Sequence, residues 1–166
     1  MGAFLKNDLI DELFRKYYNE AILYTMSLCR NKTQAEDIVS EAFFKALSSA
    51  DDSITNFKPW LLTVCRNEFL MQCRKQSRLS DEEISEETAV QEDETLNRII
   101  RQEEYRRLYR TIAMLPASQK EAVILFYFNG LSVKDISTIV GKSESNVKVL
   151  LHRAREELRK NMEVFR

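Results

Sequence analysis

The chain has 166 residues and a formal net charge of −1, and 44% of its residues are hydrophobic. This length allows one ordinary domain or two small ones. It contains no run of roughly 20 apolar residues that would span a membrane, and acids interrupt its first residues where a signal peptide has an apolar core. We therefore expect a cytoplasmic protein.

The residue types favour helices and argue against a metal centre. Only three Gly and two Pro are present, and such a turn-poor composition predicts an all-α fold. Three widely spaced cysteines and a single histidine supply neither a disulfide framework nor a convenient four-ligand zinc site. We expect no metal and no cofactor.

Charge is distributed unevenly along the chain. Residues 58–78 carry a net charge of +4, residues 80–94 carry −8, and residues 142–166 carry +3. An acidic stretch with few apolar residues cannot offset the entropy lost on ordering. The pattern predicts two helical domains, at residues 1–76 and 96–166, joined by a flexible acidic linker at residues 77–95.

Helical periodicity runs through the first domain. Apolar residues recur at helical spacing over residues 9–28 and again over residues 38–47. The sequence TQAE (33–36) has the spacing of a capping box at the start of the second helix. Pro59 suits the first turn of a third helix, so this domain is predicted to be a bundle of three or four helices.

On the second predicted helix, Asp37 and Glu41 are four residues apart and therefore share one face, beside Ile38. An acidic patch with an apolar edge suits a basic helical partner. Considered alone, the same pattern also fits an ordinary solvated face.

In the second domain, a helix is predicted over residues 96–115, where Pro116 ends it. The sequences SQKE (118–121) and SVKD (132–135) are two further candidate capping boxes. Between them, EAVILFYF (121–128) forms a strongly apolar helix that stops at an Asn-Gly pair.

Residues 132–156 have the pattern of a helix-turn-helix. This motif needs a small residue where its helices touch, a residue that tolerates positive φ at the turn, and inward apolar residues. Ser137 and Gly141 meet the first two needs, and the third is met by Ile136, Val140, Val147 and Leu150. A simple helical hairpin is the alternative.

The second helix of this motif leaves a polar set for DNA. Hydroxyl and amide groups near its start suit base edges, whereas Lys148, Arg153 and Arg155 suit phosphates. Glu144 either reads a cytosine amine or caps the helix. The candidates are Ser143, Glu144, Ser145, Asn146, Lys148, His152, Arg153 and Arg155.

Residues 35–47 (AEDIVSEAFFKAL) and 57–78 resemble the core-binding and promoter-melting regions of bacterial RNA polymerase sigma factors of the extracytoplasmic-function group. Residues 115–159 resemble the C-terminal domain of the same family. The resemblance implies that the first domain (sigma region 2) melts the minus-ten element and the second (sigma region 4) reads the minus-thirty-five element. It also implies that Asp37, Ile38 and Glu41 bind the polymerase.

The partners implied by this resemblance are core RNA polymerase, through the clamp of its β′ subunit and the flap of its β subunit, promoter DNA and an anti-sigma factor. Strand opening needs a cationic groove and a pocket for an extruded base, and residues 51–57 resemble the loop that forms this pocket. The minus-ten candidates are Ser53, Thr55, Asn56, Phe57, Lys58, Arg66, Asn67, Arg74 and Lys75.

The predicted linker is long enough for both domains to reach their elements. About 17 base pairs of duplex span roughly 55 to 60 Å, and residues 77–104 extend to roughly 90 Å. The eight acids of the linker are also expected to discourage DNA binding in the absence of polymerase.

Two other functions compete with this interpretation. A dimeric helix-turn-helix regulator needs a dimerisation or ligand-sensing domain, and the first half has neither a heptad seam nor a glycine-rich loop. A nuclease would need acids held rigidly, but the densest acids lie in the linker. We expect neither enzymatic activity nor a stable homodimer.

Overall fold

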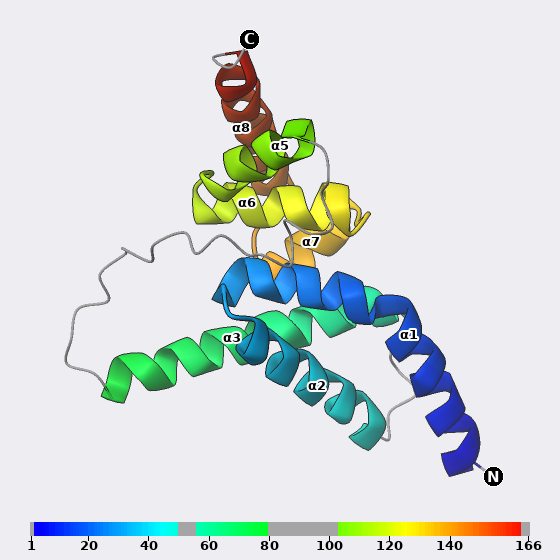
Figure 1. Ribbon diagram of the computed structural model, residues 1–166. Helices are drawn as coiled ribbons and strands as arrows, with labels where there is room; N and C mark the ends of the chain where they lie inside the picture. The colour runs from blue at the N-terminus through cyan, green and yellow to red at the C-terminus, as the bar shows by residue number, and fades with distance from the viewer. Residues whose placement is uncertain (1, 50–55, 80–102, 164–166) are drawn as a thin grey trace.

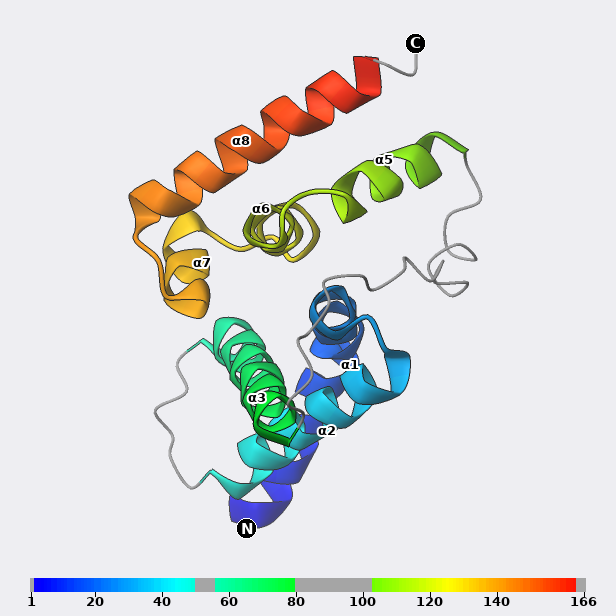
Figure 2. The same ribbon diagram turned by 90° about the vertical axis from the view of Figure 1, so that its left-hand side faces the viewer.

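The computed structural model describes residues 2–49, 56–79 and 103–163, and within these ranges every regular element is a helix (Figure 1). The predicted all-α fold is therefore confirmed. The helices form two groups, and Figure 2 shows the second group stacked on the first. Most of the predicted linker lies outside the described ranges, but Ser77 and Arg78 belong to the last turn of a helix.

Three helices form the first group: α1 (Gly2–Cys29), α2 (Lys32–Ser48) and α3 (Phe57–Leu79). Their apolar stripes face one another, as the helical spacing predicts. Burying each large side chain contributes roughly 1.5–3 kcal/mol. The side chains that are at most 1% exposed in this core are Ala21, Tyr24, Thr25, Ala35, Ile38, Val39, Ala42, Leu61, Leu62 and Cys65.

A two-residue connection turns the chain from α1 into α2. Arg30 adopts a left-handed conformation (φ 54°), and its N–H donates to the carbonyl of Met26 at 2.9 Å. Asn31 then caps α2, because its Oδ1 accepts from the Gln34 N–H at 3.0 Å. The capping box predicted at residues 33–36 is wrong, since the helix has already begun at Lys32.

The second group contains two helices, a π-helical turn and the helix-turn-helix. Its elements are α5 (Glu103–Ala113), α6 (Ala117–Val123), η1 (Ile124–Phe128), α7 (Val133–Val140) and α8 (Glu144–Glu163). Helix α5 ends before Pro116, as predicted, whereas residues 96–102 lie outside the described ranges. The apolar segment stops at Asn129 and Gly130, and the φ of +65° at Gly130 explains the choice of glycine.

Of the two capping boxes predicted in this group, the one at residues 132–135 has its predicted N-cap bond. The Ser132 hydroxyl accepts from the Asp135 N–H at 3.1 Å and so caps α7. The box predicted at residues 118–121 is wrong, because α6 begins directly after Pro116 and has no side-chain cap. The Glu121 carboxylate points instead toward the first group of helices, where Tyr24 donates to it.

The two groups share one apolar core. Buried side chains of α1, α2 and α3 and of α6, η1 and α7 form a single cluster, in which Leu125 and Ile136 are 0% exposed. A smaller cluster within the second group packs α5 and α8 against α6. No helix that the structure describes has both the length and the apolar character needed to cross a membrane.

Candidate polymerase and nucleic-acid interfaces

The turn between α7 and α8 has the geometry that a helix-turn-helix requires. Gly141 ends α7 in the left-handed region (φ +68°), and its N–H donates to the Ser137 carbonyl at 3.0 Å. The Ser137 hydroxyl donates across the turn to the Lys142 carbonyl. Gly141 therefore does what the sequence predicts for it. The Ser137 hydroxyl bridges the turn through a hydrogen bond that the sequence did not predict.

Replacing Gly141 with alanine should destabilise the protein by about 1–2 kcal/mol, because a Cβ is disfavoured at this φ. Apart from the adjoining residues, no heavy atom lies within 4 Å of the added carbon, so backbone strain is the expected cause. Urea unfolding followed by circular dichroism measures the change. Gly141→Asn should cost less, since asparagine tolerates this conformation, and an equal cost for both variants would contradict the explanation.

All eight predicted residues of the recognition segment are exposed in the structure. The Ser143 hydroxyl accepts from the Asn146 N–H at 3.1 Å, so Ser143 caps α8. This leaves the exposed Glu144 side chain to solvent or to a partner. Arg155 is held sideways, because its Nε donates to the Tyr127 hydroxyl at 2.6 Å and its guanidinium lies 5.7 Å from the ring centre.

Sequence reasoning missed two residues near this surface. Val149 is 44% exposed and lies one helical turn from both Ser145 and His152, in the middle of the outward face of α8. Tyr127 is 53% exposed on η1 and orients Arg155. Counting helical positions from the buried Val147 places Val149 on the outward face. Val149 was not identified because an apolar side chain is usually assigned to the core.

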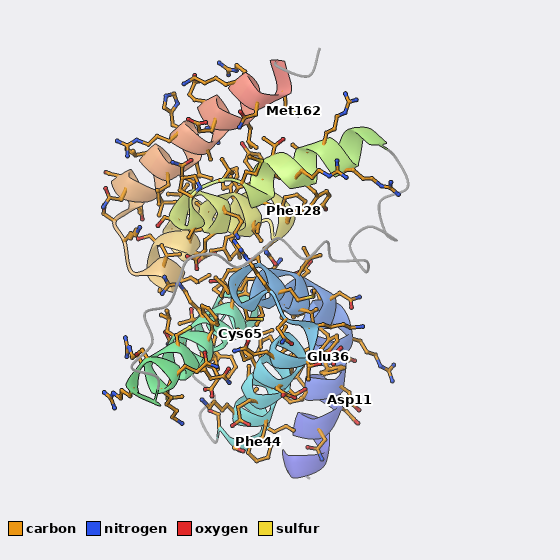
Figure 3. All side chains as sticks on the ribbon, turned by 60° about the vertical axis from the view of Figure 1, so that its left-hand side comes forward. Asp11, Glu36, Phe44, Cys65, Phe128 and Met162 are labelled. Carbon is orange, nitrogen blue, oxygen red and sulfur yellow. The ribbon has the colours of Figure 1, made fainter. Side chains whose placement is uncertain are left out.

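The exposed side of α2 carries the predicted acids. Asp37 and Glu41 are both exposed. Ile38, predicted for the same contact, is 0% exposed and therefore supports this face from inside the core. Two large apolar side chains of α2 are exposed: Leu47, at 40%, and Phe44, which is 61% exposed and lies at the surface of the first group (Figure 3). Phe44 follows Asp37 by two helical turns, a spacing that would have identified it.

The loop and helix start predicted for the minus-ten element are only partly described. Ser53 and Thr55 lie outside the described residues, and Asn56 is exposed. The Phe57 ring is partly buried in an aromatic cluster, with its centre 5.9 Å from the rings of Tyr17 and Phe43. Phe57 therefore anchors the start of α3.

The predicted polar residues of α3 divide into two sets. Asn67, Arg74 and Lys75 are exposed along the outer side of the helix. Lys58 and Arg66 are instead engaged with other side chains, and only 18% and 21% of their side-chain surfaces are exposed. Lys58 forms an ion pair with Glu20 at 2.6 Å, and Arg66 forms one with Glu121 at 2.7 Å.

Cys65 lies in the interior of the first group (Figure 3), where burial raises the pKa of its thiol to about 12. The thiol therefore stays protonated, and unreactive, below that pH.

At pH 8 we expect Cys65 to react with a disulfide reagent about 100-fold or more slowly than an unburied cysteine. Guanidinium chloride should make all three cysteines react, whereas rapid reaction of all three in the folded protein would contradict the burial.

Within the described part of the chain, no three His, Cys, Asp or Glu side chains gather closely enough to hold a metal ion. The surfaces described above offer hydrogen bonds, charge and apolar contact. Their chemistry suits recognition of a macromolecule.

Comparison with known proteins assigns both halves of the chain. The family model for sigma-70 region 2 matches residues 13–79, and that for sigma-70 region 4 matches residues 105–158. The ECF RNA polymerase sigma factor SigM of Bacillus subtilis is 34% identical over 159 residues, which cover 90% of this chain and 93% of SigM. The sigma factor YlaC of the same organism is 30% identical over 163 residues, which cover 93% of this chain and 92% of YlaC.

A solved structure has the same fold. The sigma factor RpoE of Bartonella quintana, in complex with the anti-sigma factor NepR, superimposes with a TM-score of 0.69 at 26% identity. The match covers 94% of this chain and 98% of RpoE.

Proposed function

The chain belongs to the extracytoplasmic-function group of sigma-70 factors, and from this we propose that it binds core RNA polymerase and directs it to specific promoters to initiate transcription. The observation that carries the proposal is the pairing of two exposed surfaces on one chain. An acidic face lies within the region 2 match, and the polar recognition residues of α8, all before residue 156, lie within the region 4 match.

The acidic face of α2 is proposed to bind the clamp of the polymerase β′ subunit. Asp37 and Glu41 supply charge for a basic helix, and Phe44 supplies an apolar anchor that the sequence alone assigned to Ile38. A central apolar contact surrounded by charge is a common arrangement in protein interfaces. The flap of the β subunit is the proposed partner of the second domain.

The residues along α3 are proposed to hold the opened minus-ten strand. Asn67, Arg74 and Lys75 are exposed and can contact a single strand directly. Lys58 and Arg66 join them only after giving up the partners they have in this structure. Asn56, with Ser53 and Thr55 of the preceding loop, is proposed to line the pocket for the extruded base.

The outward face of α8 is proposed to read the minus-thirty-five element in the major groove. Ser145 and Asn146 suit base edges, and Lys148 and Arg153 suit phosphates. Val149, in the middle of this face, offers the apolar contact that a thymine methyl group favours. Ser143, Glu144, His152 and Arg155 complete the surface.

The domain boundaries proposed from the sequence, 1–76 and 96–166 with an acidic linker at 77–95, let one chain reach both promoter elements. An anti-sigma factor is the proposed regulator, since RpoE of Bartonella quintana is held by one. A dimeric helix-turn-helix regulator finds no support among these relatives, which are sigma factors.

Transcription in vitro tests the proposed function. Bacterial core polymerase, this protein and a pool of promoter fragments should give initiation at a defined subset of promoters. Core polymerase alone should give none. Tight binding of duplex DNA by a homodimer, with no initiation in the presence of the cognate polymerase, would contradict the proposal.

A further inference from the structure

The interface between the two helical groups contains charged residues as well as apolar ones. Helix α7 packs against α3, while α6 and η1 pack against α1, and Figure 2 shows α7 lying between α3 and α8. The apolar cluster continues across this interface. Two of the charged contacts within it involve Lys58 and Arg66, the two minus-ten candidates that are already engaged.

Glu121 of α6 accepts two hydrogen bonds from the first group at one oxygen. The Tyr24 hydroxyl donates to Oε1 at 2.6 Å, and Arg66 Nε donates to the same atom at 2.7 Å. Tyr24 is 0% exposed and Glu121 is 9% exposed. Tyr24 is 97 positions from Glu121 in the sequence, and Arg66 is 55 positions from it. The contact therefore depends on the docking of the two groups.

Both donors stay protonated in this contact. Burial, together with the Glu121 carboxylate, holds the pKa of Tyr24 well above its usual value, so that the hydroxyl keeps its proton. Burial alone would lower the pKa of Arg66, but the hydrogen bond and charge of Glu121 raise it. Removing either Arg66 or Glu121 would leave the charge of the other partly buried with no opposite charge beside it.

Lys58 makes a second contact of the same kind. Its ammonium group donates to the backbone carbonyl of Asn129, just after η1, and pairs with Glu20 of α1. Asn129 is itself fixed, because it is 3% exposed and its Nδ2 donates to the Ile124 carbonyl at 3.1 Å. The second group therefore engages two cations of α3, through a carboxylate and a carbonyl.

We infer that Glu121 and the Asn129 carbonyl form a latch, which docks the second domain on the first and keeps Lys58 and Arg66 away from DNA phosphates. The inference rests on the proposed function, because it assigns both cations to the minus-ten strand. In the latched form their charges are neutralised by residues of the same chain. The latch and the single strand compete for the same two side chains.

The dimensions of a promoter require the latch to open. Elements separated by about 17 base pairs lie roughly 55 to 60 Å apart along the duplex, whereas α7 touches α3 in the latched form. One chain cannot hold both elements in this arrangement. The outward residues of α8 remain exposed, so the latch acts on the minus-ten surface and leaves the recognition helix accessible.

X-ray scattering of the full chain tests the latch without polymerase or DNA. Glu121→Arg places a cation beside Arg66, and should raise the radius of gyration by roughly a fifth or more as the domains separate. The charge exchange Arg66→Glu with Glu121→Arg should restore the compact form. Glu12→Arg makes the same charge change on an exposed residue of α1 and should leave the wild-type value.

Circular dichroism should show that Glu121→Arg keeps its helices. If helicity falls, Arg66→Gln removes the other partner and should produce the same expansion. The latch would be overturned if the wild type had a radius of gyration as large as that of Glu121→Arg. It would also be overturned if the radius of gyration of Glu121→Arg were as small as that of the control Glu12→Arg. If the double variant Arg66→Glu with Glu121→Arg keeps the larger radius of gyration, the specific pairing of Arg66 with Glu121 is overturned.

A binding measurement tests the competition with DNA. Glu121→Gln should bind a random-sequence single-stranded 20-nucleotide probe roughly 3- to 10-fold more tightly than Glu12→Gln, because a larger fraction of molecules is open. Equal affinities would overturn the competition. Two results separate the latch from the proposed function. If the proposed function is wrong but the latch is right, neither the wild type nor any variant initiates transcription, yet Glu121→Arg still has a larger radius of gyration than the wild type. If the latch alone is wrong, the wild type initiates transcription and the two radii of gyration are equal.

Discussion

Replacing Asp37 and Glu41 together with arginine should reduce promoter-directed initiation by about 100-fold or more. The two acids lie on one exposed face of α2, and reversing both charges at a contact with a basic helix costs several kcal/mol. Because neither side chain belongs to the core, folding should be unaffected. Multi-round transcription with core polymerase measures the loss, and co-migration with core polymerase during gel filtration shows whether binding is the step affected.

Asp11 and Glu12 provide the matched control for this experiment. Both are exposed acids of α1 in the same helical group, so Asp11→Arg with Glu12→Arg makes the same change in net charge. This control should initiate transcription as the wild type does. If both double variants lost initiation equally, the cause would be a general effect of charge. The proposal that α2 binds the clamp would then be contradicted.

Replacing Lys148 and Arg153 with alanine should weaken binding to duplex DNA carrying the minus-thirty-five element by about tenfold or more. Each phosphate contact contributes about 0.9 to the slope of log affinity against log salt concentration, so the slope should fall by about 1.8. Fluorescence anisotropy at several salt concentrations measures both quantities. Since these residues are exposed in the docked form, the measurement needs no opening of the domains.

The control for the recognition helix is the pair Arg159 and Lys160, which lie on the same helix farther from its N-terminus and are also exposed. Their double alanine variant removes the same charge from α8. Its salt slope should stay near that of the wild type. A slope reduced equally in both variants would show that α8 attracts DNA only through its net charge.

Local signals account for the parts of the fold that the sequence predicted. Helical spacing of apolar residues identified the stripes that α1 and α2 bury, and Gly141 was recognisable because few residues tolerate its φ of +68°. The helix-turn-helix was predicted for the same reason, since each of its requirements falls within about 25 residues. In these places local preference and tertiary packing agree.

Contacts between distant residues account for what the sequence did not reveal. Glu121 has the spacing of a capping residue, but its carboxylate bonds Tyr24 and Arg66 instead. No local pattern distinguishes the two roles, because the second exists only once the domains dock. Ile38 shows a smaller error of a different, local origin, since a shift of one position on a helix moves a side chain from the surface to the core.

The π-helical turn η1 affects how this chain aligns with its relatives. The Asn129 N–H donates to the Ile124 carbonyl, five residues back, at 3.0 Å, so the turn holds one residue more than an α-helical turn would. That extra residue rotates the chain after it by about 100° relative to a continuous α-helix. Against a relative whose helix is α-helical throughout, a single-residue gap therefore belongs within residues 124–128. Placing it in the loop at Asn129 and Gly130 would shift the η1 residues that follow the insertion by one position.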